Sequence, residues 1–158
     1  MTMSITSTQP QGNPFNALAT VLLTRLDTEQ ADFPMLRGDQ LPGFHPVPNQ
    51  CHDNADRWVN ANRGDLVLRG WLLDAEGDAD TYSPYRFVAH SVVLTTLGNM
   101  IDVTLPSTER ARRFIVHPYE VCGFFAILCS PPLANTLQVF VTPPADDLPA
   151  GDASGEVA

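Results

Sequence analysis

The stretch PNQCHDNADRWV, residues 48–59, decides how the chain is organised. It follows an irregular, proline-rich segment, and from Cys51 onward the apolar residues recur at helical spacing, with Ala55 and Trp58 on one face. Gly64 then supplies a stop signal. We therefore predict a helix of about three turns that begins at or just before Cys51.

Outward from this helix, the pattern is that of a mixed α and β protein. Upstream, helical spacing predicts a helix over 14–27, followed by an irregular loop over 31–50. Downstream, runs typical of β-strands cover 65–73, 85–95, 100–105, 114–117 and 136–142. The apolar segment 120–129 fits either a buried strand or a short helix. The order of elements predicts an α+β fold with the Cys51 helix packed on an antiparallel β-sheet.

The two ends of the chain differ in composition from the middle. Residues 1–13 and 143–158 are rich in Ser, Thr, Gly, Pro and Asp and have few apolar side chains. We expect a disordered N-terminal tail, a disordered acidic C-terminal tail and, between them, a single domain over 14–142.

The net charge of −9, with only 9 Lys and Arg residues, limits the choice of partner. Nucleic acids and anionic membranes are bound through clustered positive charge, so neither is expected here. No apolar run is long enough to span a membrane, and residues 1–13 do not read as a secretory leader. We expect a chain that is cytoplasmic when made, with later leaderless secretion left open. The sequence indicates no oligomeric state.

Cys51 stands where a cysteine can become reactive. A thiol attacks a carbonyl carbon as its thiolate, and unpaired N–H groups in the first turn of a helix lower the pKa of the thiol. A nucleophile of this kind also needs an imidazole to hold the proton and a third group to orient that imidazole. His90 in a predicted strand and Asp102 in the next strand are the candidates for these two tasks.

The turn between the two strands decides whether His90 and Asp102 meet. A turn centred at Thr96 places Asp102 directly opposite His90, whereas one centred at Leu97 keeps the shared face but shifts the pairing. A turn centred between two residues places Asp102 on the face opposite to His90, unless a bulge at Gly98 adds one residue and returns Asp102 to the same face.

The simplest alternative for His90 is a structural one. It is a polar residue among apolar neighbours, and a buried neutral histidine can be satisfied by backbone carbonyl groups alone. The positions of Cys51 and Asp102 favour the catalytic interpretation over this one.

The segments CHDNADRWV (51–59), GWLL (70–73), AHSVV (89–93) and IDVT (101–104) resemble the papain-like cysteine peptidase and amidase superfamily, including its small bacterial amidases and its transglutaminase-like branch. They keep the unpermuted order Cys, His, Asp over about a third of the chain. The resemblance implies a papain-like core, with Cys51 as nucleophile, His90 as general base and acid, Asp102 as the orienting residue and a thioester intermediate.

The oxyanion hole is where the chain departs from papain. Papain has a glutamine six residues before its cysteine, and His45 occupies that place here. The backbone N–H of Cys51 and a side-chain amide from Asn49 or Gln50 are the expected donors. Both amides have helix capping as an alternative role.

Several further side chains are interpreted structurally. Trp58 and Trp71 are candidates for lining a cleft, although core anchoring is the commoner role of tryptophan. His52 lies beside Cys51, but neither C-x-x-C nor H-x-x-x-H occurs, so no metal or other cofactor is expected. We interpret His52, Asp53 and Asp56 as a solvated helix face. Cys122 and Cys129 are expected in the core.

Three functions remain open at this level. The first is a cysteine hydrolase that cleaves an amide bond in a peptide, an isopeptide or cell-wall material. The second uses the same thioester to deamidate or crosslink glutamine in a partner protein. The third is a catalytically silent binding or inhibitor module on the same scaffold.

Overall fold

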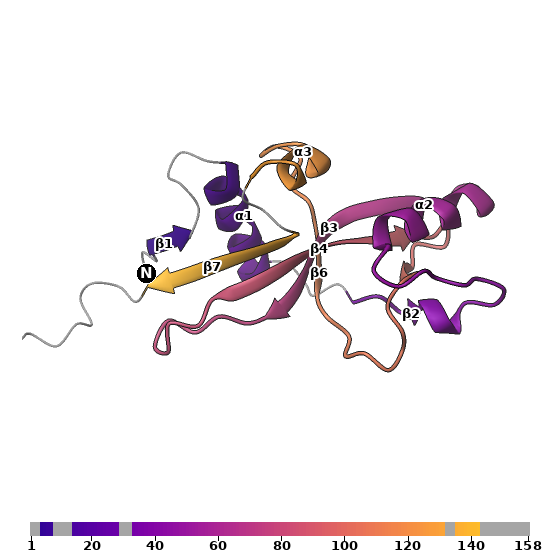
Figure 1. The fold of residues 1–158 in the computed structure, drawn as a ribbon, viewed down its shortest axis with the longest axis horizontal. Coiled ribbons are helices and arrows are strands. Elements are labelled where there is room, and N and C mark those ends of the chain that lie inside the picture. Colours follow the sequence, from indigo (N-terminus) through magenta and orange to yellow (C-terminus); the bar gives the residue numbers. More distant parts are fainter. Residues whose placement is uncertain (1–3, 8–13, 29–32, 132–134, 143–158) are drawn as a thin grey trace, which may run out of the picture.

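The computed structural model describes residues 4–7, 14–28, 33–131 and 135–142, and these form a mixed α and β structure (Figure 1). This confirms the α+β class. Within these ranges no helix combines the length and the apolarity needed to cross a membrane. The elements are β1 (Ser4–Ser7), α1 (Pro14–Thr28), β2 (Leu36–Arg37), the 3-10 turn Gly38–Gln40, α2 (Cys51–Ala61), β3 (Leu66–Ala75), β4 (Tyr85–Leu94), β5 (Met100–Asp102), β6 (Phe114–Val116), α3 (Phe124–Leu128) and β7 (Thr136–Thr142).

In the described part of the chain, seven strands form one sheet. The main path runs β1-β7-β4-β3-β6, and β5 pairs with β4 on one side and with β2 on the other. The β2 and β5 pair is parallel, and the other pairs are antiparallel. β3 and β4 pair from Leu66↔Leu94 to Leu73↔Phe87, before a bulge shifts the register. The sheet therefore grows outward from this long central hairpin.

β1 lies inside the segment 1–13 that was predicted to be disordered. It pairs antiparallel with β7, from Ser4↔Thr142 to Ser7↔Val139. The prediction is wrong for these four residues, because backbone hydrogen bonds to a neighbouring strand need no apolar side chains and leave little trace in composition. The rest of 1–13 and the predicted tail 143–158 lie outside the described residues.

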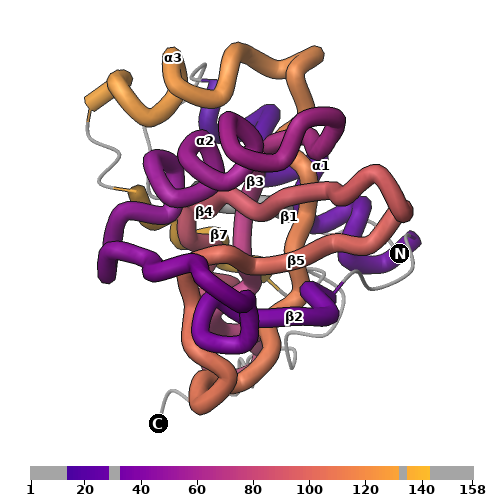
Figure 2. Tube along the Cα trace, turned by 90° about the vertical axis from the view of Figure 1, so that its right-hand side faces the viewer, coloured from indigo at the N-terminus to yellow at the C-terminus, as the bar shows by residue number. Residues whose placement is uncertain are grey.

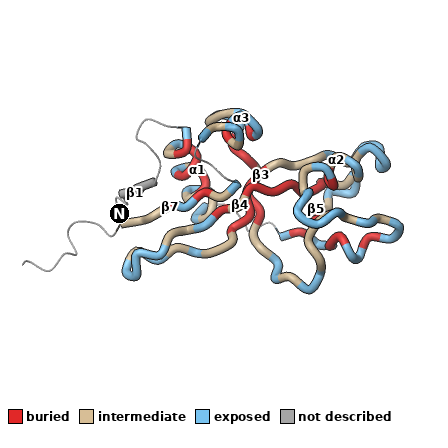
Figure 3. Tube along the Cα trace, in the orientation of Figure 1, coloured by how far each residue is buried: buried red, intermediate tan, exposed pale blue. Residues whose placement is uncertain are grey.

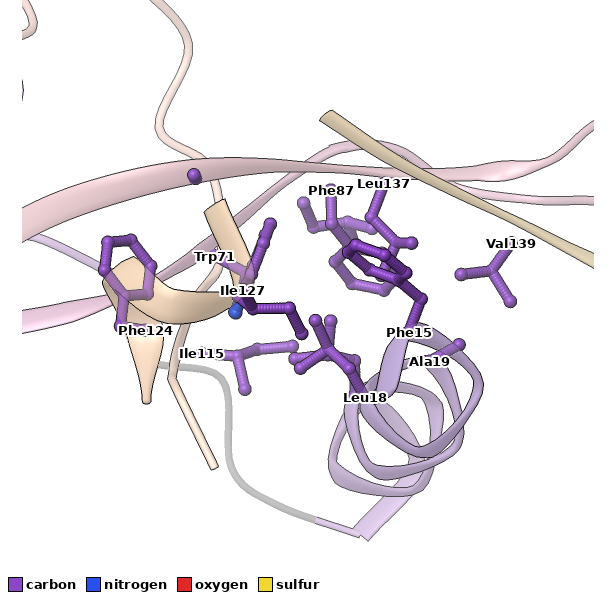
Figure 4. Close-up of a cluster of buried hydrophobic side chains, with 13 residues drawn as sticks. Phe15, Leu18, Ala19, Trp71, Phe87, Ile115, Phe124, Ile127, Leu137 and Val139 are labelled. Carbon is purple, nitrogen blue, oxygen red and sulfur yellow. The ribbon is translucent and has the colours of Figure 1, made fainter. Parts of the chain in front are cut away.

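α1 forms the larger core with one end of the sheet. Pro14 suits the first helical position, where its missing N–H would have no partner. Phe15, Leu18 and Leu22 follow at helical spacing and are fully buried. Figure 4 shows the buried cluster to which these α1 side chains belong, and its other members include Trp71, Phe87, Ile115, Phe124, Ile127, Leu137 and Val139.

α2 covers the other end of the same face. Alternate residues of a strand point to opposite faces, so Phe87, Ser91 and Val93 share one face of β4. Phe87 belongs to the α1 core, whereas Val93 packs with Ala55 of α2 in a second core. Figure 3 shows that burial is concentrated where β3 and β4 cross the centre of the molecule. The first turn of α2 lies against the middle of β4, where His52 contacts Ser91. Figure 2 shows α2 next to β3 and β4 from a second direction.

Candidate functional site

Cys51 is the first residue of α2, as the helical spacing predicted. The loop turns into the helix through Asn49, which has a φ of 62°, and Gln50, whose carbonyl accepts the N–H of Asn54 at 2.8 Å. The first N–H groups of a helix have no intrahelical partner, so negative charge is stabilised here. Cys51 is half-buried. The residue is therefore partly shielded from water and partly accessible.

Asn54 fixes this helix start to the rest of the fold. Its side chain is fully buried, and it pairs with both backbone groups of Val47: Oδ1 accepts the N–H at 3.0 Å and Nδ2 donates to the carbonyl at 2.8 Å. Nδ2 also donates to Thr104 Oγ1 at 3.1 Å. The loop before Cys51 and the segment after Asp102 are thereby held by one amide.

Replacing Asn54 with alanine is expected to lower the free energy of unfolding by about 1–3 kcal/mol, because it leaves the Val47 backbone groups without partners. Urea denaturation measures this. Asn60→Ala, at an exposed position on the same helix, is the matched control and should change stability by less than about 0.5 kcal/mol. Equal stability of the two variants would show that the hydrogen bonds of Asn54 do not hold this part of the fold together.

His90 and Asp102 share a face and are in direct contact. His90 Nε2 lies 2.9 Å from Asp102 Oδ2. β4 and β5 pair in the register of a turn centred at Leu97, not Thr96, so Asp102 lies a diagonal step from His90. The observed pairs are Val93 with Ile101 and Leu94 with Met100. Of the alternatives considered, the Leu97 turn is therefore confirmed, and the partner of His90 is a carboxylate.

Asp102 is held in its ionised form. It is fully buried, and Oδ1 accepts the N–H groups of Thr104 at 2.9 Å and Leu105 at 3.0 Å. Arg37, which is also buried, places a guanidinium nitrogen 3.7 Å from Oδ2. Burial raises the pKa of Asp102, but hydrogen bonding to His90 and to the two backbone groups outweighs it, and the pKa lies below its ordinary 3.8. The ionised carboxylate therefore accepts a hydrogen bond from Nε2–H of His90.

Cys51 and His90 favour each other's charged forms. Burial raises the pKa of the Cys51 thiol, but hydrogen bonds from His52 and His90 and their charge lower it from 9.0 to about 6. Burial lowers the pKa of His90, but Asp102 and Cys51 raise it from 6.5 to about 9. Because Nε2 of His90 faces Asp102, the other ring nitrogen, Nδ1, is the one left for the sulfur. Between about pH 6 and 9 the pair is a thiolate and an imidazolium.

His52 belongs to the site, so its interpretation as a solvated residue is wrong. Its Nδ1 lies 3.7 Å from Cys51 Sγ and 2.6 Å from Ser91 Oγ, and its ring meets Phe124 and Phe125 edge-on. His90 and Ser91 are neighbours in β4 and point to opposite faces of the sheet. Cys51, the first residue of α2, contacts His90, and His52, the second, contacts Ser91. The spacing of α2 alone gave no sign of this, because α3 supplies the covering rings.

The other predicted site residues differ in whether they lie near Cys51. Asn49 and Gln50 are exposed beside Cys51, and Gln50 makes no capping hydrogen bond with its side chain. Trp71 is wrong as a cleft residue, because it is fully buried against α1 and donates to His117 Nδ1 at 3.1 Å. Trp58 does line a pocket, of about 460 Å³, but Cys51 is not part of that pocket's lining.

The remaining side chains near the site differ in exposure. Asp53 is exposed as expected, whereas Asp56 forms an ion pair with Arg69 at 2.7 Å. Cys122 is half-buried, and Cys129 is exposed, which contradicts its predicted place in the core. The cause is that only Phe124–Leu128 within this segment forms a helix, the short α3, which turns only part of its surface inward and ends before Cys129. Among the described residues, no group of three or more His, Cys, Asp or Glu side chains is arranged to hold a metal ion.

These groups together can perform nucleophilic chemistry. The site combines a thiolate at a helix start, an imidazolium able to donate a proton, and a buried carboxylate that orients the ring. No protein-family model matches the sequence, and neither a curated protein nor a solved structure matches the chain. The chemistry of the site therefore has to be argued from its own residues.

Proposed function

We propose that the chain is a cysteine hydrolase that cleaves an amide bond in a peptide or protein substrate. The observation that carries the proposal is the arrangement of Cys51 at the start of α2, in hydrogen-bond contact with His90, whose Nε2 lies 2.9 Å from the buried carboxylate of Asp102. This arrangement agrees with a pKa of about 6 for the thiol and about 9 for the imidazole. A cysteine kept only for packing needs neither a histidine nor a buried carboxylate behind that histidine. Catalytic sites are where such shifts are concentrated.

The first half of the reaction forms a thioester. The thiolate of Cys51 attacks the carbonyl carbon of the substrate, and the carbonyl oxygen becomes an oxyanion. The imidazolium of His90 donates its proton to the leaving nitrogen, the carbon–nitrogen bond breaks, and the amine departs. Asp102 accepts the hydrogen bond from Nε2–H of His90 and so keeps Nδ1 of the ring directed toward the sulfur.

The second half releases the acid. Neutral His90 removes a proton from water, the hydroxide attacks the thioester, and the carbon–sulfur bond breaks to regenerate the thiolate. The backbone N–H of Cys51 is one oxyanion donor, since the first N–H groups of a helix are unpaired. The exposed amide of Asn49 or Gln50 is proposed as the second donor.

The proposal includes a papain-like core. Its support is the combination of α2 packed on a mostly antiparallel sheet, a cysteine as the first residue of that helix, and the order Cys51, His90, Asp102 along the chain. The transglutaminase-like branch shares this order, so the fate of the thioester separates hydrolysis from transfer to an amine.

Alkylation of Cys51 across pH tests the proposal. With iodoacetamide and mass spectrometry of each cysteine-containing peptide, we expect the rate at Cys51 to rise with a midpoint at about pH 6, because burial, which opposes ionisation, is outweighed by the two histidines. Hydrolysis of N-acyl amides should rise near pH 6 and fall near pH 9, as His90 loses the proton that the leaving group needs.

Cys129 is exposed and provides an internal reference in the same digest. A Cys51 midpoint close to the ordinary 9.0 would remove the ground for the proposed function.

A further inference from the structure

His52 is the residue next to the nucleophile that the triad does not use. Its Nδ1 is 3.7 Å from Cys51 Sγ, so the sulfur has an imidazole on α2 as well as the one on β4. The ring is also covered by Phe124 and Phe125, with ring centroids 5.4 Å and 5.5 Å away. A side chain on the solvated face of a helix would have neither neighbour.

A chain of polar contacts from β3 fixes this ring. Ser91 is fully buried, and its Oγ lies 2.6 Å from His52 Nδ1 and accepts a hydrogen bond from Arg69 at 2.9 Å. Arg69 also donates to the backbone carbonyl of His52 at 3.3 Å and to Asp56 at 2.7 Å. Its guanidinium lies over the ring of Phe125, 5.1 Å from the centroid. Both the backbone and the ring of His52 are thus held by one arginine and one serine.

The position of the proton on His52 follows from its neighbours. The oxygen of Ser91 has two lone pairs, so it can accept from Arg69 and from a proton on His52 Nδ1 at the same time. A negative sulfur beside the same nitrogen favours the tautomer that carries this proton. In that tautomer Nδ1 is a donor and cannot take up the proton of Cys51, which leaves that task to His90.

We propose that His52 is a second imidazole of the catalytic site, which shares its single Nδ1–H between Ser91 Oγ and the Cys51 sulfur and so holds the sulfur as thiolate. His90 alone exchanges protons with the substrate, and Ser91 and Arg69 set the position of the His52 ring. The inference rests on the proposed function in taking Cys51 as the nucleophile. Consistent with it, burial raises the pKa of Cys51, and the hydrogen bond from His52 is the largest of the effects that lower it.

The elements around Cys51 and His52 carry several other charged or titratable side chains. They are Asp53 and Asp56 on α2, Arg69 on β3, His90 on β4, and Asp102 on β5 with Arg37 beside it. From α3, the two phenylalanines Phe124 and Phe125 face the His52 ring.

Two substitutions at His52 separate a hydrogen-bond role from a packing role. In His52→Leu the donor is lost, so the alkylation midpoint of Cys51 should rise from about 6 by about one pH unit or more, with labelling at pH 5 about tenfold slower. In His52→Asn the amide nitrogen replaces Nδ1, and the midpoint should return toward the wild-type value. Asn60→Ala, on the exposed side of α2, should leave it unchanged.

Ser91→Ala provides a second route if His52→Leu does not fold. It removes the hydroxyl that orients the ring and should raise the midpoint in the same direction by a smaller amount. An unchanged midpoint in whichever of these two variants folds overturns the inference. A wild-type midpoint near 9.0 instead defeats the proposed function itself, so the two failures are distinguishable.

Discussion

Replacing Cys51 with alanine is expected to lower amide hydrolysis by a factor of about 10⁴ or more, since no thioester can form without the sulfur. The effect should be as large in Cys51→Ser. A hydroxyl is far less acidic than this thiol, whose pKa of about 6 depends on His52 and His90 outweighing burial. Initial rates on N-acyl amides and short peptide amides measure the loss, with circular dichroism confirming that each variant is folded.

The matched control is Cys129→Ala, at the exposed end of α3, which should retain wild-type rates. Activity that persists in Cys51→Ala would show that the nucleophile lies elsewhere. A biological effect that persists without hydrolysis would instead favour the silent binding module. Adding a primary amine separates the two enzymatic functions, because a transferring enzyme incorporates it into the acyl product and a strict hydrolase does not.

The helix at Cys51 and the central hairpin could be predicted from the sequence because local patterns determine them. Helical spacing after Cys51 gave the start of α2, and long β-type runs gave β3 and β4. Whether His90 and Asp102 share a face could not be predicted, because the two-residue period of a strand places them together only if the turn is centred on a residue or carries a bulge. The pairing of Val93 with Ile101 shows that the turn is centred at Leu97.

The position of His52 could not be predicted because it depends on contacts between distant segments. Arg69 and Ser91 are cross-strand partners in β3 and β4, and α3 comes from a segment whose periodicity fitted both helix and strand. Arg37 lies behind Asp102 for a similar reason, since it reaches the site through the parallel pairing of β2 with β5. Charged residues in irregular loops carry no periodic signal of burial.

Asp102→Ala is the substitution expected to cost the most stability. It leaves His90 and Arg37, both buried, without the carboxylate between them, and it removes the acceptor for the Thr104 and Leu105 N–H groups. Breaking a buried charged pair in this way lowers the free energy of unfolding by about 3–5 kcal/mol. That is a large part of the roughly 5–15 kcal/mol of a typical domain.

Urea denaturation at several pH values measures this cost. Burial raises the pKa of Asp102, but hydrogen bonding lowers it below 3.8, so its contribution is present above pH 3.8 and is lost as pH falls through the folded-state pKa. The gap between wild type and variant should therefore narrow in acid. Asp53→Ala, an exposed carboxylate on α2, should stay within about 0.5 kcal/mol of wild type. An Asp102→Ala variant as stable as this control would contradict the buried pairing.

Asp102→Asn tests the orienting role with little change in shape. If the amide oxygen keeps the N–H groups of Thr104 and Leu105, the amide NH₂ faces His90 Nε2. The ring must then carry its proton on Nδ1, the nitrogen left for Cys51, and it can no longer accept the thiol proton there. Hydrolysis should fall by about 10²–10⁴-fold, and the alkylation midpoint of Cys51 should rise above about 6. Full activity in this variant would mean that Asp102 only stabilises the fold, because the tautomer of His90 would then not matter for the reaction.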